Sequence, residues 1–192
     1  MAAVRVVGGT LRGRPLATPH DMAIRPTSDR VREAMFNILA HGIEDFDLEG
    51  ARVLDLFAGT GALGVEALSR GARFCLFVEE EAEARALIRQ NVEAFGLTGV
   101  TKIFRRNATD LGPVQGGARY RLAFLDPPYG KGLGEQALAS AAAGGWLEPG
   151  ALCVLEERKD AKIEFPADFA LVDTRTWGDT SVSFLRYRQP QS

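Results

Sequence analysis

The sequence has 192 residues, which is room for one domain with a sizeable core and at most a short appendage. Hydrophobic residues make up 46% of the chain and charged residues 25%, a composition that excludes disordered and fibrous proteins. No apolar run approaches the roughly 18 residues of a membrane helix, and no secretory signal is seen, so we expect a cytoplasmic protein without membrane contact. Cys75 and Cys153 lie far apart in apolar runs, which excludes a disulfide framework and a zinc site.

The charges are unevenly distributed along the chain. The formal net charge is -2, yet the first 36 residues hold six arginines against three acidic residues. Of the 23 basic residues 19 are arginines, whose planar guanidinium suits contacts with phosphates and bases better than lysine does. A biased genome composition would explain the same excess, so the charge alone leaves both explanations open.

The N-terminal segment differs in character from the rest of the chain. A short apolar run is followed by two glycines and a turn-rich, basic stretch, which predicts an arm over residues 1–27. From residue 28 onward apolar residues recur at helical spacing, and Thr27 or Ser28 is available as the N-cap. A helix over residues 28–40 therefore opens the main domain, residues 28–192.

Beyond residue 50, apolar runs too short for helices alternate with helical patterns that end at glycines. We expect strands over 52–57, 74–79, 100–105, 122–126 and 151–156, helices over 62–70, 81–95 and 133–143, and a closing hairpin of 169–177 with 182–188. This alternation indicates an α/β fold with a mostly parallel sheet and helices on both faces. The hairpin would add antiparallel strands at one edge.

A glycine-rich loop follows the first predicted strand. Gly59, Gly61 and Gly64 fit the Gly-x-Gly-x-x-Gly pattern, in which the backbone turns tightly, approaches a ligand and packs the next helix against the strand. Alone, the pattern is common in turns after strands. Glu79, however, ends the next strand 18 residues after Gly61, where an acid accepts both hydroxyls of a ribose.

Asp55 distinguishes between two cofactors that use such a loop. A dinucleotide places a pyrophosphate at the helix N-terminus, whereas S-adenosylmethionine carries an ammonium and a sulfonium instead. A carboxylate beside the loop repels a pyrophosphate and attracts an ammonium. Asp55 therefore favours S-adenosylmethionine.

The fourth predicted strand ends in Asp126, which Pro127, Pro128 and Tyr129 follow. Read as structure alone, the prolines end a strand and the tyrosine is a core residue. Read as chemistry, the Asp126 carboxylate and the Pro127 carbonyl would each accept one N–H of an exocyclic amine, while Tyr129 stacks on its base. Such positioning holds reacting atoms about 3–3.5 Å apart and requires no metal.

Together these segments resemble a known family. Asp-Leu-Phe-Ala-Gly-Thr-Gly-Ala-Leu-Gly at 55–64 with Asp-Pro-Pro-Tyr at 126–129 is similar to class I S-adenosylmethionine-dependent amino-methyltransferases of nucleic acids. Two N-terminal segments narrow the resemblance: Val-Val-Gly-Gly-Thr-Leu-Arg-Gly-Arg at 6–14 and Arg-Pro-Thr-Ser-Asp-Arg-Val-Arg-Glu-Ala-Met-Phe-Asn at 25–37. They closely resemble the RsmD family, bacterial methyltransferases of guanine N2 in 16S ribosomal RNA. The resemblance spans nearly the whole chain.

This resemblance implies a Rossmann-like class I methyltransferase with a seven-stranded sheet. It implies 16S ribosomal RNA in the 30S subunit, or in an assembly intermediate, as the partner. The cofactor contacts that it implies are Arg25, Thr27, Asp55, Phe57, Gly59, Gly61, Glu79, Asn107, Ala108 and Asp126. It implies the amine site at Asp126, Pro127, Pro128 and Tyr129, where the family often has Phe in place of Tyr129. Asn107 also fits a plain turn residue.

The basic arm would then contact RNA. Arg5, Arg12 and Arg14 precede any acidic residue, so they either grip phosphates or form a solvated arm. No coiled coil or apolar stripe calls for a second copy, and we expect a monomer.

Three other functions fit part of these observations. A DNA adenine or cytosine amino-methyltransferase shares the Asp-Pro-Pro-Tyr chemistry, but the core leaves no residues for a target-recognition domain. A nicotinamide-dependent oxidoreductase lacks a proton donor, since His20 and His41 lie in or near the N-terminal region. A catalytically silent RNA-binding assembly factor keeps every motif, and only an activity assay separates it.

Overall fold

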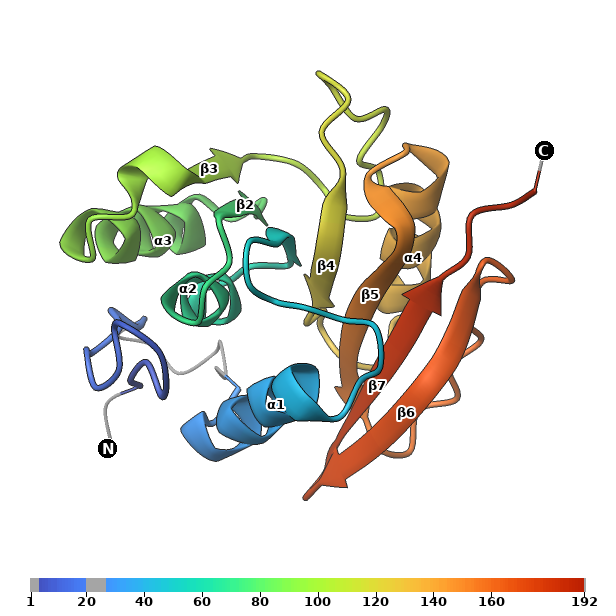
Figure 1. Ribbon diagram of the computed structural model, residues 1–192, viewed down its shortest axis with the longest axis horizontal. Helices are drawn as coiled ribbons and strands as arrows, with labels where there is room; N and C mark the ends of the chain where they lie inside the picture. The colour runs from blue at the N-terminus through green and yellow to red at the C-terminus, as the bar shows by residue number, and fades with distance from the viewer. Residues whose placement is uncertain (1–3, 20–26, 192) are drawn as a thin grey trace.

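The computed structural model describes residues 4–19 and 27–191. The helices and strands alternate along the chain as predicted (Figure 1). In chain order they are α1 (Asp29–His41), β1 (Arg52–Leu56), α2 (Ala62–Ser69), β2 (Phe74–Val78), α3 (Ala82–Ala94), the 3-10 helix η1 (Thr98–Val100), β3 (Thr101–Phe104), β4 (Tyr120–Leu125), α4 (Leu133–Ala143), β5 (Leu147–Arg158), β6 (Phe169–Trp177) and β7 (Thr180–Tyr187).

The strands form one seven-stranded sheet in the order β3-β2-β1-β4-β5-β7-β6. The first five are parallel, and β7 pairs antiparallel with both β5 and β6. The prediction of a mostly parallel sheet with a C-terminal antiparallel hairpin is confirmed. Strand order reverses between β1 and β4, and ligands of such sheets bind beyond the strand ends at this reversal.

Two apolar layers cover the sheet because side chains alternate between its faces along each strand. Val53, Phe77 and Phe124 face α1, α2 and α3 in one core. Leu54 and Leu125 belong to the second core, which α4 covers. Helices therefore lie on both faces of the sheet, as predicted, with α1, α2 and α3 on one side (Figure 1).

The N-terminal segment lies beside α2 (Figure 1). Arg5 and Pro15 form an isolated antiparallel bridge, and the side chains of Val6 and Leu16 are buried in the core that α1 and α2 share. The backbone N–H of Thr10 donates to the Ser69 carbonyl at 2.8 Å. The arm is thus fixed by apolar and backbone contacts, while its division from the domain at residue 27 stays a prediction.

Strand β5 begins four residues before the predicted start. The four added residues include Pro149, and the pairing with β4 skips across them, from Leu147 opposite Tyr120 to Leu152 opposite Leu122. A proline is tolerated inside a sheet at such an irregularity because no ladder hydrogen bond is needed from it. Within the described part of the chain, no helix has the length and apolarity needed to span a membrane.

Candidate active site

Four carboxylates gather at the carboxyl ends of neighbouring parallel strands. Asp55 lies in β1, Glu79 directly follows β2, Asp126 directly follows β4, and Glu156 lies near the end of β5. In register, Leu56 pairs with Leu125 and Leu125 with Leu155. Each acid continues the alternating row of core residues that face α1, α2 and α3, so all four belong to one face of the sheet edge.

The glycine loop between β1 and α2 has an unusual backbone. Phe57, Gly59 and Gly61 all have left-handed φ values, of 55°, 59° and 80°. For a bulky residue such as Phe57 this conformation costs about 1–3 kcal/mol, and such outliers gather at ligand sites. Gly64 has no room for a side chain, because an added Cβ would overlap the Phe77 ring and the Cys75 sulfur.

Asp55 fixes the end of this loop at the start of α2. Its Oδ2 accepts the backbone N–H of Gly64 at 3.0 Å, and the side chain is fully buried. Burial raises the pKa of Asp55 well above its usual value, the hydrogen bond from Gly64 opposes this, and the charge of Glu79 adds to it. Asp55 therefore shapes the turn into α2, and a direct contact with a cofactor ammonium stays a prediction.

Glu79 joins the glycine loop to the start of α3. Its Oε1 accepts the N–H of Gly59 at 2.8 Å, and its Oε2 accepts the N–H of Glu81 at 3.0 Å. Each carboxylate oxygen has a second lone pair. The half-buried side chain can therefore still accept the hydroxyls of a ribose.

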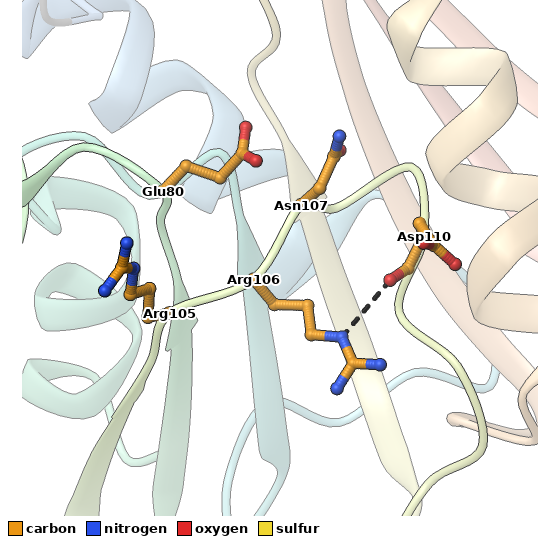
Figure 2. A pocket seen from close by; sticks show the side chains of 5 residues that line it. All are labelled: Glu80, Arg105, Arg106, Asn107 and Asp110. Atoms are coloured by element: carbon orange, nitrogen blue, oxygen red, sulfur yellow. Dashed lines mark hydrogen bonds between the residues drawn. The ribbon is translucent and has the colours of Figure 1, made fainter.

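A shallow pocket of about 300 Å³ lies past the ends of β2 and β3. Its lining residues, drawn in Figure 2, are Glu80, Arg105, Arg106, Asn107 and Asp110. Asn107 Oδ1 accepts the backbone N–H of Thr109 at 2.8 Å and its hydroxyl at 2.7 Å, which is the turn geometry that the sequence also allowed. Ala108 beside it is buried. Their contact with an adenine stays a prediction.

The Asp-Pro-Pro-Tyr segment is held by the end of β5. The Tyr129 hydroxyl donates to Glu156 Oε1 at 2.7 Å, and the N–H of Gly130 donates to Glu157 Oε1 at 3.1 Å. Pro127 is buried, whereas the Tyr129 side chain is 38% exposed. Tyr129 is thus partly exposed while its hydroxyl is fixed.

Thr27 lies between the two acids of β4 and β5. Its hydroxyl donates to Glu156 Oε2 at 2.8 Å and lies 3.5 Å from Asp126 Oδ2. Burial raises the pKa of Asp126 well above its usual value, and the nearby charges of Glu156 and Asp55 raise it further. Burial and the same Glu156 also raise the pKa of Tyr129. Asp126, beside the Thr27 hydroxyl and Glu156, is therefore placed to form a hydrogen bond with a polar group of a ligand.

Comparison with known proteins identifies the family. A family model described as conserved hypothetical protein 95 matches residues 4–186. The chain is 37% identical over 169 residues to the ribosomal RNA small subunit methyltransferase D of Escherichia coli (strain K12), covering 88% of this chain and 82% of that protein. The chain belongs to the RsmD family. Another RsmD relative, the enzyme of that same name from Haemophilus influenzae, is 33% identical over 93% of this chain and 91% of its own length.

Solved structures agree with the RsmD assignment. A putative methyltransferase, yhhF, from Escherichia coli superposes with a TM-score of 0.83 at 29% identity, covering 98% of this chain and 100% of that one. An RNA methyltransferase from Salinibacter ruber, in complex with S-adenosyl-L-homocysteine, has a TM-score of 0.63 at 17% identity over 87% of this chain and 96% of that one. That likeness shows a shared fold.

Several polar residues at the site of this RsmD member were not predicted. Glu156 was assigned only to a strand, although an acid that ends an apolar strand was the available signal. Arg32 is fully buried, and its Nη1 donates to the Thr27 carbonyl at 3.1 Å. Asn91 of α3 donates to the Thr60 carbonyl at 3.0 Å and accepts the N–H of Ala17 at 2.7 Å, which ties the arm to the glycine loop.

The predicted RNA contacts lie on the surface. Arg5, Arg12 and Arg14 are exposed, and the Arg14 guanidinium covers the Phe95 ring at 4.8 Å. Arg25 lies outside the described residues. Among the residues that the structure describes, no group of three or more His, Cys, Asp or Glu side chains could hold a metal ion.

Proposed function

We propose that this protein transfers a methyl group from S-adenosylmethionine to the exocyclic N2 of a guanine in 16S ribosomal RNA. The observation that carries the proposal is the position of Asp126 at the end of β4, directly beside the strand that bears the glycine loop. A methyl donor on the loop and an amine at Asp126 would meet there. The relatives' printed name, ribosomal RNA small subunit methyltransferase D, supports RNA as the substrate.

The residues at the strand ends fit this cofactor. The left-handed glycines allow the backbone to approach a ligand closely, and Glu79 has lone pairs for a ribose. Asn107 and Ala108 would lie at the adenine, while Asp55, with Phe57, would lie at the methionine moiety. Arg25 and Thr27 would lie near the methionine end or the RNA. The cofactor supplies a methyl group bound to a sulfonium sulfur, and after the transfer this sulfur belongs to a neutral thioether.

The amine site works by positioning. The Asp126 carboxylate and the Pro127 carbonyl each accept one N–H of the guanine amine, so that its weakly nucleophilic nitrogen points toward the methyl donor. Tyr129 stacks on the base, and the two prolines stiffen the loop. The amine loses its proton late, to Asp126 or to water. The raised pKa of Asp126 makes this carboxylate a better proton acceptor than an exposed aspartate.

The RNA is held by positive charge on the arm. Arg5, Arg12 and Arg14 would contact phosphates, confining RNA to one side of an otherwise acidic protein. The partner would be 16S ribosomal RNA in the 30S subunit or in an assembly intermediate, and the protein would act as a monomer. It would work in the cytoplasm, where ribosomal subunits are assembled.

Mass spectrometry of ribosomal RNA from a strain lacking this protein tests the proposal. We expect one guanine of 16S RNA to lose one methyl group and to regain it when the gene is restored. Incorporation of tritiated methyl into undermethylated 30S particles and into duplex DNA separates the RNA and DNA alternatives. Unchanged RNA methylation, or methyl transfer to DNA alone, would contradict the proposal.

A further inference from the structure

The Glu156 side chain joins two segments that lie on either side of Asp126. Its Oε1 accepts the Tyr129 hydroxyl at 2.7 Å, and its Oε2 accepts the Thr27 hydroxyl at 2.8 Å. Only 5% of Glu156 is exposed. Tyr129 follows β4 by four residues, whereas Thr27 precedes α1, so one carboxylate fixes two elements that are distant in the sequence.

The sheet brings these groups together. Leu125 and Leu155 pair in register, which puts Asp126 and Glu156 next to each other on adjacent parallel strands. Arg32 of α1 donates from Nη1 to the Thr27 carbonyl at 3.1 Å, so Thr27 is fixed through its backbone as well as through its hydroxyl. A buried carboxylate that accepts two hydroxyl groups forms short, charge-assisted hydrogen bonds, about twice as strong as neutral ones.

We propose that Glu156 is a positioning residue for methyl transfer, which fixes the Tyr129 ring and the Thr27 hydroxyl around Asp126. This inference rests on the function proposed above and adds a residue on β5 to the amine site on β4. Without Glu156 the exposed tyrosine ring keeps its stacking surface but loses its fixed orientation. A base stacked on that ring would then present its amine to Asp126 in the correct geometry for a smaller fraction of the time.

The charge of Glu156 gives the proposal a second readout. Three titratable groups lie around Glu156, namely Asp126 after β4, Asp55 of β1 and Tyr129. Arg32 binds the Thr27 carbonyl, and Thr180 of β7 contacts Tyr129. Glu156 adds a negative charge beside Asp126, which disfavours ionisation of Asp126. Its removal therefore makes Asp126 ionise at lower pH.

The test compares E156Q with wild type in methyl transfer to undermethylated 30S particles. We expect kcat to fall roughly tenfold or more. The acid limb of the kcat profile should move to lower pH, because Asp126 ionises more readily, and the Kd for S-adenosylmethionine, by calorimetry, should change less than about twofold. E148Q, at the opposite end of the same strand, is the matched control and should behave as wild type.

A second variant protects the test against misfolding. Y129F keeps the stacking ring and removes only the hydroxyl bound to Glu156, so it should also lower kcat. The double variant should be no slower than E156Q alone, because both changes break the same contact. The role of Glu156 would be overturned if the two losses in kcat multiply in the double variant. An E156Q enzyme with the wild-type kcat and pH profile would overturn it as well. A wild type that transfers no methyl would instead contradict the proposed function and, with it, this inference.

Discussion

Arg32 and Glu66 form an ion pair that is fully buried, with Arg32 Nε donating to Glu66 Oε1 at 3.2 Å. Glu66 also accepts the backbone N–H groups of Val7 at 2.9 Å and Gly8 at 3.0 Å, and Arg70 Nε lies 2.9 Å from it. The pair therefore connects the N-terminal arm, α1 and α2. Through the Thr27 carbonyl, the same arginine reaches the amine site.

Breaking this pair should destabilise the fold. Arg32→Met leaves the Glu66 carboxylate buried with Arg70 as its remaining charged partner. Removing one partner of a buried pair costs about 3–5 kcal/mol, and we expect the lower end of that range because Arg70 stays. Urea unfolding measures the loss. Arg30→Met, on the exposed side of the same helix, should change stability by less than about 0.5 kcal/mol, and equal losses in both variants would contradict the importance of the pair.

Gly64 should be intolerant of a side chain despite its place in a helix. Glycine to alanine in a helix interior normally stabilises by roughly 0.5–1 kcal/mol. At Gly64 the added methyl group would overlap Phe77 and Cys75, and overpacking costs about 1–3 kcal/mol, so the overlap should decide the sign. Gly64→Ala should lower the melting temperature, while Gly99→Ala, with open space around it, should not. A more stable Gly64→Ala protein would contradict this packing.

The buried Asp55 predicts a pH-dependent stability. Because burial raises its folded pKa, the folded state retains a proton that the unfolded state releases above about pH 4. The contribution of Asp55 to the free energy of unfolding is therefore complete below about pH 4, and it decreases as the pH rises toward the pKa of Asp55 in the folded state. Asp55→Asn should gain stability over wild type by up to about 1.4 kcal/mol per pH unit in that window. Urea unfolding at several pH values tests this, and a difference that does not vary with pH would contradict it.

The arm arginines should contribute to RNA binding through charge. Arg12→Ala should weaken binding to 30S particles, and the slope of log affinity against log salt should become shallower by about 0.7–0.9 for each lost phosphate contact. Arg119→Ala is the control, since that exposed arginine precedes β4, at the end of the sheet away from the carboxylates. Equal effects of the two substitutions would indicate unspecific attraction and contradict a defined arm contact.

The sequence predicted the elements whose signal is local. The strand ends Asp55, Glu79 and Asp126 were found because glycine, proline and acidic residues stand out against apolar runs. Buried polar partners were missed, because Arg32 and Glu66 acquire their roles only when separate helices meet. From composition alone, each is an ordinary charged residue on a helix.

The start of β5 was missed for a related reason. Pro149 usually ends a strand, and only the irregular pairing with β4 makes it acceptable within one. Glu156 belongs to the same category. Its contacts depend on the register between β4 and β5 and on the return of Thr27 to the sheet edge, neither of which a single sequence reports.

The most direct measurement is methyl transfer by Asp126→Ala to undermethylated 30S particles, with S-adenosylmethionine binding followed by calorimetry on the same protein. This role of Asp126 predicts that transfer is abolished while the cofactor still binds, since the carboxylate aligns the acceptor amine and the glycine loop stays intact. An Asp126→Ala enzyme that methylates the particles at the wild-type rate would contradict it.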